Sequence, residues 1–310
     1  MEPKVYVGVD VCKDSLDVAI GLEKHIITFT NVQKGVDAFI KKLSRIGPEL
    51  IVFESTGGYE RLATSSLVEA GLPVVIVNPR QVRDFAKAAG ILAKTDAIDA
   101  RVIARFAAAI KPDVRHLKDH DTLELTALVT RRRQIIEMVV AENNRLKLAN
   151  KRSEKDIMTH IRWLKKRLDK IESDIDKMIQ SSPIWRCKAD ILQSVPGIGP
   201  ITSASLICDL PELGVLSPKK IAMLAGLAPL NCDSGKFKGR RRIWGGRASV
   251  RSGLYMATMA AIRCNPAIKE FYQRLTAAGK CHKVAATACM RKLLIIANAM
   301  LRDQMLWQQI

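Results

Sequence analysis

The first 110 residues alternate between short β-type runs and helical stretches, and this order constrains the fold more than any other feature. Residues 4–11, 15–20 and 25–30 are β-branched or alternating runs, close enough for tight turns to join them. Residues 33–46 then carry apolar side chains at helical spacing and end at Gly47-Pro48. The sequence therefore predicts three antiparallel strands followed by a helix.

The alternation continues beyond this helix. We expect a buried strand at residues 50–53, a helix at 58–70, a strand at 73–77, and helices at 79–89 and 95–110, the last with Thr95 as its N-cap. Three antiparallel strands followed by helix, strand, helix, strand and helix is the order of a ribonuclease-H-like α/β domain. We predict such a domain over residues 1–112.

Carboxylates fall at matching places in this predicted domain. Asp10 lies inside an apolar strand, where a charge is expensive unless it is paired or binds a metal, and Glu54 closes a second apolar strand. Asp96 and Asp99 stand three residues apart and share one face of their helix. In a ribonuclease-H-like sheet the first and fourth strands are neighbours and the last helix crosses their ends. We therefore expect the four carboxylates to meet.

Four carboxylates in one place need cations, and Mg²⁺ prefers oxygen ligands. Two such ions about 3.5–4 Å apart can clamp a scissile phosphate and activate a nucleophile. Each carboxylate alone has a plainer explanation, because Asp99 also suits a helix surface and Asp96 a first turn favoured by the helix dipole. The combination predicts a two-Mg²⁺ site.

The middle of the chain, residues 113–185, predicts two long helices. Apolar residues repeat at steps of four and three, as in a coiled-coil seam: Ile157, Ile161, Leu164, Leu168, Ile171, Ile175 and Met178. The stretch before it fits the same seam, with Arg132 and Glu142 interrupting. Two arrangements stay open at this point: a hairpin that turns near residues 150–154, acting as a spacer, or a stalk that pairs with another copy of the protein.

Basic side chains concentrate toward the C-terminus. The whole chain has a net charge of +19 and a pI near 9.8. Residues 1–110 contribute only +1, whereas residues 191–310 hold 17 basic and 5 acidic side chains, a net of +12. An inert cationic surface would spread its charge evenly. This distribution favours nucleic-acid binding, because basic surface gains affinity by releasing counterions from phosphates.

Two motifs in residues 186–310 suggest where nucleic acid binds. In V-P-G-I-G-P, Gly197 and Gly199 allow a tight turn between helices, as in helix-hairpin-helix modules, and bring backbone N–H groups near a phosphate. Such turns are also common in proteins with no DNA role. The second motif is a basic loop that includes Phe237 and Trp244. The predicted nucleic-acid contacts from this loop and the residues after it are Lys236, Lys238, Arg240, Arg241, Arg242, Arg247 and Arg251.

Ser249 follows the basic loop at the start of an apolar stretch with helical spacing. Its plainer interpretation is an N-cap serine. The functional interpretation is a nucleophile for phosphodiesters, with Arg247 and Arg251 neutralising the phosphate. Ser252 is a rival on spacing, and the residues alone do not favour the nucleophile.

The order of seven motifs resembles the DEDD insertion-sequence transposases, the bridge-RNA-guided recombinases related to the pilin-gene invertase. The motifs are V-G-V-D-V-C-K-D, V-F-E-S-T-G-G-Y, K-T-D-A-I-D-A-R, S-V-P-G-I-G-P-I-T-S-A, L-A-G-L-A-P, D-S-G-K and R-S-G-L-Y-M-A. The resemblance implies an N-terminal domain like that of Holliday-junction resolvases, a coiled coil, and a mainly helical C-terminal transposase domain over residues 186–310.

The same resemblance implies roles for particular residues and partners. Asp10, Glu54, Asp96 and Asp99 would be the metal-binding tetrad, and Ser249 the residue that becomes covalently linked to DNA. The partners would be double-stranded DNA, a non-coding guide RNA, and further copies of the chain in a dimer or a tetramer on DNA. No site position departs from the motif pattern.

We therefore expect a DNA recombinase that excises and inserts its own element. The first alternative is a metal-dependent nuclease or Holliday-junction resolvase that uses water, and the second is a non-catalytic nucleic-acid-binding protein. Seven scattered cysteines form no C-x-x-C pair, the N-terminus shows no secretory signal, and no uninterrupted apolar run approaches a membrane span. These features predict a cytoplasmic protein with no membrane partner, and the resemblance to insertion-sequence transposases implies that it is bacterial and associated with the nucleoid.

Overall fold

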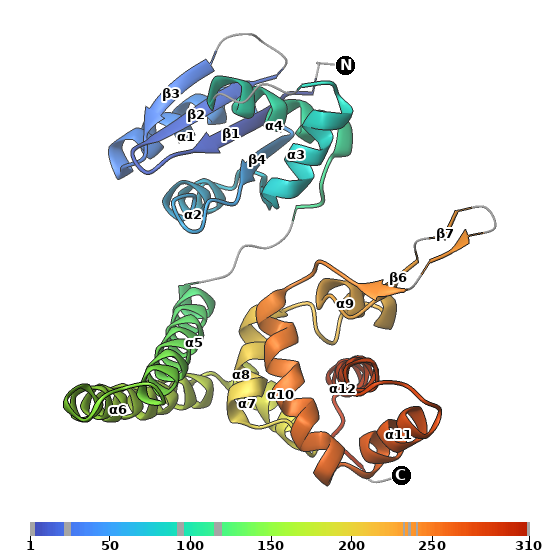
Figure 1. Ribbon diagram of the computed structural model, residues 1–310. Helices are drawn as coiled ribbons and strands as arrows, with labels where there is room; N and C mark the ends of the chain where they lie inside the picture. The colour runs from blue at the N-terminus through green and yellow to red at the C-terminus, as the bar shows by residue number, and fades with distance from the viewer. Residues whose placement is uncertain are drawn as a thin grey trace. The chain divides into compact units, whose positions relative to one another are not determined.

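The computed structural model describes residues 4–21, 26–91, 96–114, 120–231, 233–234, 237–239 and 241–308. By its internal packing the chain forms two compact units, Met1–Leu117 and Lys118–Ile310 (Figure 1). The first unit is an α/β sandwich and the second is almost wholly helical. Each unit has its own hydrophobic core.

A five-stranded sheet forms the centre of the first unit. Its strands, in chain order, are β1 (Tyr6–Val11), β2 (Ser15–Ile20), β3 (Ile26–Thr30), β4 (Leu50–Glu54) and β5 (Val74–Val77). In space the order is β3-β2-β1-β4-β5, with β1, β2 and β3 antiparallel and β4 and β5 parallel to β1. This arrangement is ribonuclease-H-like, as the sequence predicts.

Helices cover both faces of this sheet. On one face α1 (Gln33–Ile46) and α2 (Arg61–Glu69) pack against alternate residues of β1, including Val7 and Val9. On the other face α3 (Pro79–Ala88) and α4 (Asp96–Ile110) pack against Tyr6 and its neighbours. The period of two along β1 therefore divides its residues between the two faces.

The start of α2 differs from the sequence prediction. The expected helix start at Gly58 is wrong: α2 begins three residues later, because Gly57 and Gly58 have φ values of 82° and 132°, outside the helical region. Thr95, the expected N-cap of α4, lies outside the described residues, and α4 begins at Asp96.

Gly8 allows α4 to approach β1 very closely. A Cβ atom added to Gly8 would overlap the backbone nitrogen of Ala104 and the carbonyl oxygen of Ala100, both on α4. Ala100 and Ala104 themselves are buried and pack with Ala19 of β2. Small residues on three elements thus let the helix lie directly on the sheet.

The second unit begins with a helical hairpin, α5 (His120–Leu146) and α6 (Lys151–Ser181), joined by a short turn. The side chain of Asn150 caps α6 by accepting hydrogen bonds from the backbone N–H groups of Arg152 and Ser153. The seven apolar residues predicted to form a seam are all buried or half-buried. Within one chain the two helices therefore pack on each other as a hairpin.

The polar interruptions of this seam are paired. Arg132 Nε donates to Glu172 Oε1 on the facing helix at 2.7 Å, and Glu142 accepts from Arg145 at 2.8 Å. The ring of His160 on α6 lies 3.3 Å from Glu142. Pairing across the two helices satisfies charges that would be expensive to leave unpaired in a seam.

The remaining helices share one core with the hairpin. They are α7 (Pro183–Gln193), α8 (Pro200–Asp209), α9 (Pro218–Leu224), α10 (Ala248–Cys264), α11 (Pro266–Ala277) and α12 (His282–Asp303). Between α9 and α10 the chain extends as a β-hairpin formed by β6 (Pro229–Leu230), β7 (Asp233–Ser234), β8 (Phe237–Lys238) and β9 (Arg242–Ile243) (Figure 1).

By length and composition alone, α12 is the one described helix that is apolar enough to cross a membrane. In the structure it is a core helix, because 56% of that apolar window is buried. Among its buried residues are Leu293, Leu294 and Ala297.

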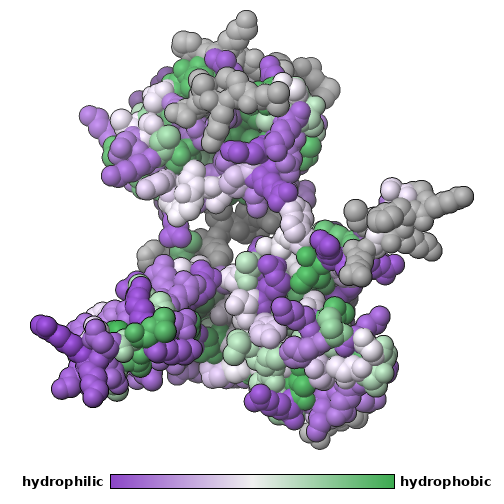
Figure 2. Space-filling model, viewed as in Figure 1, coloured by the Kyte–Doolittle hydropathy of each residue, from purple (hydrophilic) through white to green (hydrophobic). Residues whose placement is uncertain are grey.

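Exposed apolar side chains occur on the α5–α6 hairpin, among them Val140 and Trp163. Figure 2 shows hydrophobic patches on this mainly hydrophilic hairpin.

We predict that Gly8→Ala destabilises the first unit, because the added methyl group must push α4 off β1. Overpacking of this kind lowers the free energy of unfolding by about 1–3 kcal/mol. Calorimetry of the full-length chain measures the melting transition of this unit. The control is Gly253→Ala on α10, where an added Cβ meets open space and the second unit should melt no earlier. An unchanged transition in Gly8→Ala would contradict the close approach.

Candidate active site

Asp10 and Glu54 lie side by side at the carboxyl ends of two parallel strands. Val9 of β1 pairs with Phe53 of β4, so the next residues, Asp10 and Glu54, continue this register. Both side chains are half-buried. Residues in register on neighbouring strands project to the same face of a sheet. The structure therefore brings together the two carboxylates that the sequence placed on strands.

The shared face is the one that α4 covers. Asp10 follows Gly8 by two residues, so both project toward α4, whose Ala100 carbonyl oxygen lies over Gly8. Asp99, half-buried in the first turns of α4, immediately precedes Ala100. The side chain of Asp96 lies outside the described residues. Among described side chains, no group of three or more His, Cys, Asp or Glu is placed to hold one metal ion.

Asp17 is a further carboxylate on this face, and it was not among the site residues predicted from the sequence. In the antiparallel pair of β1 and β2, Asp17 is the register partner of Asp10. Directly opposed like charges destabilise a sheet. Asp17 Oδ1 accepts a hydrogen bond from Thr28 Oγ1 of β3 at 2.6 Å. Asp17, Asp10 and Glu54 thus form a row across three neighbouring strands, an arrangement that a bound cation would stabilise.

A signal for Asp17 was present in the sequence. It stands between Leu16 and Val18, both fully buried, so it is a charge within an apolar strand, as Asp10 is. Its relation to Asp10 depends on the register between β1 and β2, which the sequence pattern does not determine.

Two polar side chains fix the loops that follow the carboxylate-bearing strands. Asn31 Nδ2 donates to the backbone oxygens of Cys12, after β1, and Tyr59, in the loop after β4, at 3.1 and 3.0 Å. Glu60, only 7% exposed, accepts from the Thr56 hydroxyl at 2.6 Å and from the Gly58 backbone N–H at 2.9 Å. Both residues hold the ends of β1 and β4 in place, and neither was predicted from the sequence.

The environment of Glu60 lowers the pKa of its carboxyl group. Burial is the largest single influence and by itself raises the pKa. Hydrogen bonds to the charged form, led by the one from the Thr56 side chain, together outweigh burial. Glu60 is therefore held as a carboxylate that organises the loop between Glu54 and α2.

Ser249 is the second residue of α10. The N-cap is Arg247, which has an extended backbone (φ −81°, ψ 104°) and makes no side-chain cap. The plainer interpretation of Ser249 as an N-cap is therefore wrong. Ser249 is half-buried and its hydroxyl makes no hydrogen bond to other residues that the structure describes, while Ser252 is exposed on the next turn.

The arginines around Ser249 already have partners within the protein. Arg247 forms a two-pronged ion pair with Glu212, and Arg251 donates to the Gly245 carbonyl oxygen at 2.8 Å. By contrast, Arg241 and Arg242 are exposed on the β-hairpin, beside Trp244, which is 57% exposed. The other predicted basic contacts lie outside the described residues or side chains: Lys236, Lys238 and Arg240.

The two glycines of the predicted hairpin motif have different surroundings. Gly197, with φ 106°, packs against α10, because a Cβ added to it would lie 2.6 Å from the Cβ of Ala261. Gly199 is the N-cap of α8, and a Cβ added there would meet open space. Only Gly199 leaves room for a phosphate at the start of α8. Gly197 instead allows close packing of the turn.

Comparison with known proteins gives the class. A family model described as "Transposase" matches residues 7–149, and one described as "Transposase IS116/IS110/IS902 family" matches residues 189–273. The pilin gene-inverting protein of Moraxella lacunata is 29% identical over 97% of this chain and 96% of its own. An insertion element IS900 protein of Mycobacterium paratuberculosis is 30% identical over 67% of this chain and 50% of its own.

Among solved structures, Thermus thermophilus RuvC in complex with a Holliday junction substrate aligns with 35% of this chain and 96% of its own, at 19% identity and a TM-score of 0.27. The family matches define the class as a DNA transposase and recombinase enzyme. The chain belongs to the IS110 family of insertion-sequence transposases.

We predict that Glu60→Gln destabilises the first unit in a pH-dependent way. A carboxyl group whose pKa is lowered on folding stabilises the protein above its ordinary pKa of 4.5, and this contribution is lost as the pH falls through the lowered value. At pH 7 the variant should lose roughly 1.5 kcal/mol, the scale of a hydrogen bond to a charged group. Urea unfolding at several pH values measures this.

Below pH 4.5 the difference between Glu60→Gln and the wild type should shrink. Glu69→Gln, at the exposed last residue of α2, the helix that follows Glu60, is the matched control and should differ little from the wild type at any pH. If the difference in free energy of unfolding between Glu60→Gln and the wild type stays constant with pH, the charged form of Glu60 does not stabilise the fold as we predict.

Proposed function

We propose that this transposase cuts and rejoins DNA by attack of Ser249 on a phosphodiester, at a site where Asp10, Glu54, Asp96 and Asp99 bind Mg²⁺. The observation that carries the proposal is the in-register placement of Asp10 and Glu54 at the ends of neighbouring parallel strands, on the face covered by α4. The family membership supports it, because the motif positions of the tetrad and of Ser249 are all present.

The carboxylates fit a hard divalent cation. Their ligand atoms are all oxygens, which Mg²⁺ prefers, and the opposed pair of Asp10 and Asp17 is unfavourable without positive charge nearby. When bound, two Mg²⁺ ions would neutralise the scissile phosphate and favour the deprotonated form of an attacking hydroxyl. The carboxylates themselves would hold the metal ions and so supply the positive charge that the phosphate needs nearby.

Ser249 has the surroundings that a nucleophile for phosphate requires. It lies in the first turn of α10, whose unpaired backbone N–H groups and helix dipole favour an anion. In this step a bond would form between Ser249 Oγ and the phosphorus atom, while the bond from phosphorus to one deoxyribose oxygen breaks. The serine hydroxyl would lose its proton, and the released deoxyribose oxygen would take up a proton. The phosphoserine link conserves the energy of the broken bond, so rejoining needs no external energy source.

The basic β-hairpin supports the binding of nucleic acid. Arg241, Arg242 and Trp244 are exposed together on it, so phosphate contacts and base stacking are both available. Gly199 at the start of α8 is a second place for a backbone phosphate, as in helix-hairpin-helix modules. The partner is double-stranded DNA and, by resemblance to the family, a non-coding guide RNA. A protein with these partners would act in the bacterial cytoplasm, at the nucleoid.

Two features of the chain support a homo-oligomer. The tetrad belongs to the first unit and Ser249 to the second. The outer surface of the α5–α6 hairpin carries exposed apolar residues, Val140 at 53% and Trp163 at 55%, which suit contact with another copy. We infer a dimer, and a tetramer on DNA, in which the tetrad of one protomer faces Ser249 of a partner.

The first test is incubation of the protein with DNA and Mg²⁺ followed by a denaturing gel. We expect a covalent protein–DNA adduct that Ser249→Ala abolishes and Ser252→Ala retains. Asp10→Asn and Glu54→Gln should lower the adduct by about 10²–10³-fold, since each removes a negative charge that would hold the Mg²⁺ ions that stabilise the transition state, with DNA binding nearly intact. Free cleaved ends would indicate a nuclease that uses water, and unchanged DNA a non-catalytic binding protein.

The second prediction concerns the β-hairpin. Replacing Arg240, Arg241 and Arg242 with alanine should weaken DNA binding and flatten its salt dependence by about 0.9 in log–log slope for each phosphate that the hairpin no longer neutralises. Binding titrations at several salt concentrations measure this slope. The matched control removes the same charge from the exposed residues Lys41, Lys42 and Arg45 of the first unit and should leave the slope nearly unchanged. Equal salt-dependence slopes for the two variants would show that the hairpin does not contact DNA phosphates.

The third prediction concerns sharing of the site between protomers. Asp10→Asn and Ser249→Ala should each be inactive alone, and a mixture of the two should recover recombination because one intact tetrad can face one intact serine. The readout is recombinant DNA product in mixtures shown by native mass spectrometry to contain both variants. No recovery in such mixtures would mean that each chain builds its own site.

A further inference from the structure

The start of α10 is held by an ion pair from outside the helix. Arg247 Nη1 and Nη2 donate to Glu212 Oε2 and Oε1 at 2.5 and 2.6 Å, and Nη1 also donates to the carbonyl oxygen of Asp209 at 3.0 Å. The side chains are 31% and 22% exposed, so the pair is largely shielded from water. Two parallel hydrogen bonds fix the direction of the guanidinium group as well as its distance.

The turn before α10 is fixed at the same place. The backbone N–H of Arg247 donates to the Leu224 carbonyl oxygen at 2.8 Å. Gly246 lies on Gly226, at the end of α9, so closely that a Cβ on Gly246 would be 2.5 Å from the Gly226 Cα. Arg251 reaches back to the Gly245 carbonyl oxygen. These interactions hold the two ends of the β-hairpin together just before the start of α10, where Ser249 lies.

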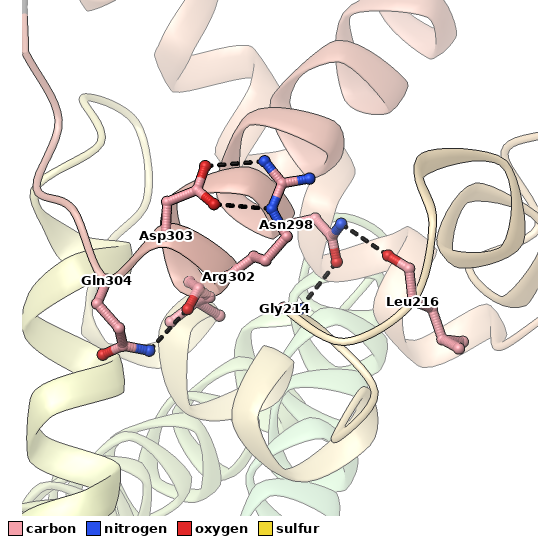
Figure 3. Close-up of polar contacts among 7 residues, drawn as sticks. Gly214, Leu216, Asn298, Arg302, Asp303 and Gln304 are labelled. Carbon is pink, nitrogen blue, oxygen red and sulfur yellow. Dashed lines mark hydrogen bonds and ion pairs between the residues drawn. The ribbon is translucent and has the colours of Figure 1, made fainter.

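The loop that carries Glu212 is itself held from behind by α12. The buried side chain of Asn298 accepts from the Gly214 backbone N–H at 2.8 Å and donates to the Leu216 carbonyl oxygen at 3.0 Å (Figure 3). Both groups of the amide are used, so Asn298 fixes the loop in one orientation. Polar contacts thus connect α12, through the loop that carries Glu212, to Arg247, the residue before α10.

This arrangement affects the first turn of α10 and leaves the rest of the helix independent. Val250, Leu254 and Ala257 are buried in the core and anchor α10 without the ion pair. Within the first turn only Val250 is anchored in the core and there is no side-chain cap, so the path of the chain into this turn, beside Ser249, is set by Arg247 and the groups that it binds. Loss of the ion pair would therefore displace Ser249 while α10 stays folded.

We propose that Arg247 and Glu212 are positioning residues that fix Ser249 relative to the base of the β-hairpin, and that Arg247 is not a phosphate ligand. This inference rests on the proposed role of Ser249 as the nucleophile. The guanidinium group has its hydrogen bonds directed at Glu212 and Asp209, so binding DNA would require breaking a shielded ion pair. A displacement of about 1 Å at a nucleophile can lower a rate by about 10²-fold.

The test compares variants that remove the charge of one partner and keep a polar side chain. Arg247→Gln and Glu212→Gln should each lower the rate of adduct formation at saturating DNA by about 10- to 100-fold and leave the salt dependence of DNA binding unchanged. Because both break the same pair, the double variant should be little slower than either single variant. Asp303→Asn is the matched control: it breaks the exposed ion pair with Arg302 at the end of α12 and should leave both the rate and the salt dependence unchanged.

Hydrogen exchange of the free protein gives a readout that does not need activity. In Glu212→Gln the two hydrogen-bonded amides that flank this turn, those of Arg247 (to the Leu224 carbonyl oxygen) and Arg251 (to the Arg247 carbonyl oxygen), should exchange faster, with no change around Ala257 and Ala261. Slow adduct formation with faster local exchange supports the proposal. A flattened salt dependence in Arg247→Gln together with a wild-type rate in Glu212→Gln would overturn it, as would wild-type rates in both variants.

If the wild-type protein forms no adduct, the proposed nucleophile is wrong, and hydrogen exchange decides separately whether the ion pair fixes the start of α10. Faster exchange confined to that turn would support the fixing role, and unchanged exchange would overturn it.

Discussion

The first unit depends on the direct backbone contact between β1 and α4 at Gly8. Any side chain at this position would separate the helix from the sheet, because its Cβ would overlap α4. The apolar residues behind the contact, Val102, Ile103 and Phe106, bury α4 against the same face. With the helix this close, Ala100, the residue after Asp99, lies over Gly8, two residues before Asp10. Apolar packing thus holds Asp10, Asp17 and Glu54 in one row on neighbouring strands against their mutual repulsion.

Much of this unit could be predicted from the sequence because its signals are local. Period-two strands, turn residues and a charge inside an apolar run identified the sheet order, Asp10 and Glu54. Asp17 carries the same local signal, but its significance arises from its pairing with Asp10 across β1 and β2. Glu60 could not be predicted, because its role comes from a loop conformation that requires Gly57 and Gly58 at positive φ.

In the second unit the sequence identified residue types better than their roles. Arg247 and Arg242 look alike in a basic run, yet one pairs with Glu212, 35 residues away, and the other is exposed. Gly197 and Gly199 belong to one motif, yet one packs on α10 and the other faces open space. In each case the distinction depends on a neighbour far away in sequence. A sequence pattern can indicate a basic or glycine-rich segment, but it does not reveal which residue of that segment already contacts another part of the protein.

The contact between Gly226 and Gly246 has a consequence for how this family can diversify. The two ends of the β-hairpin meet at this backbone contact, beside the helical core. Its strands β6 to β9 therefore form a loop that begins and ends at one place on the second unit. Lengthening such a loop adds little closure entropy, about 0.6 kcal/mol per doubling. The outer part of the hairpin can therefore be exchanged or extended as a module while α10 keeps its place. The length and sequence of the outer hairpin can therefore change without moving the start of α10.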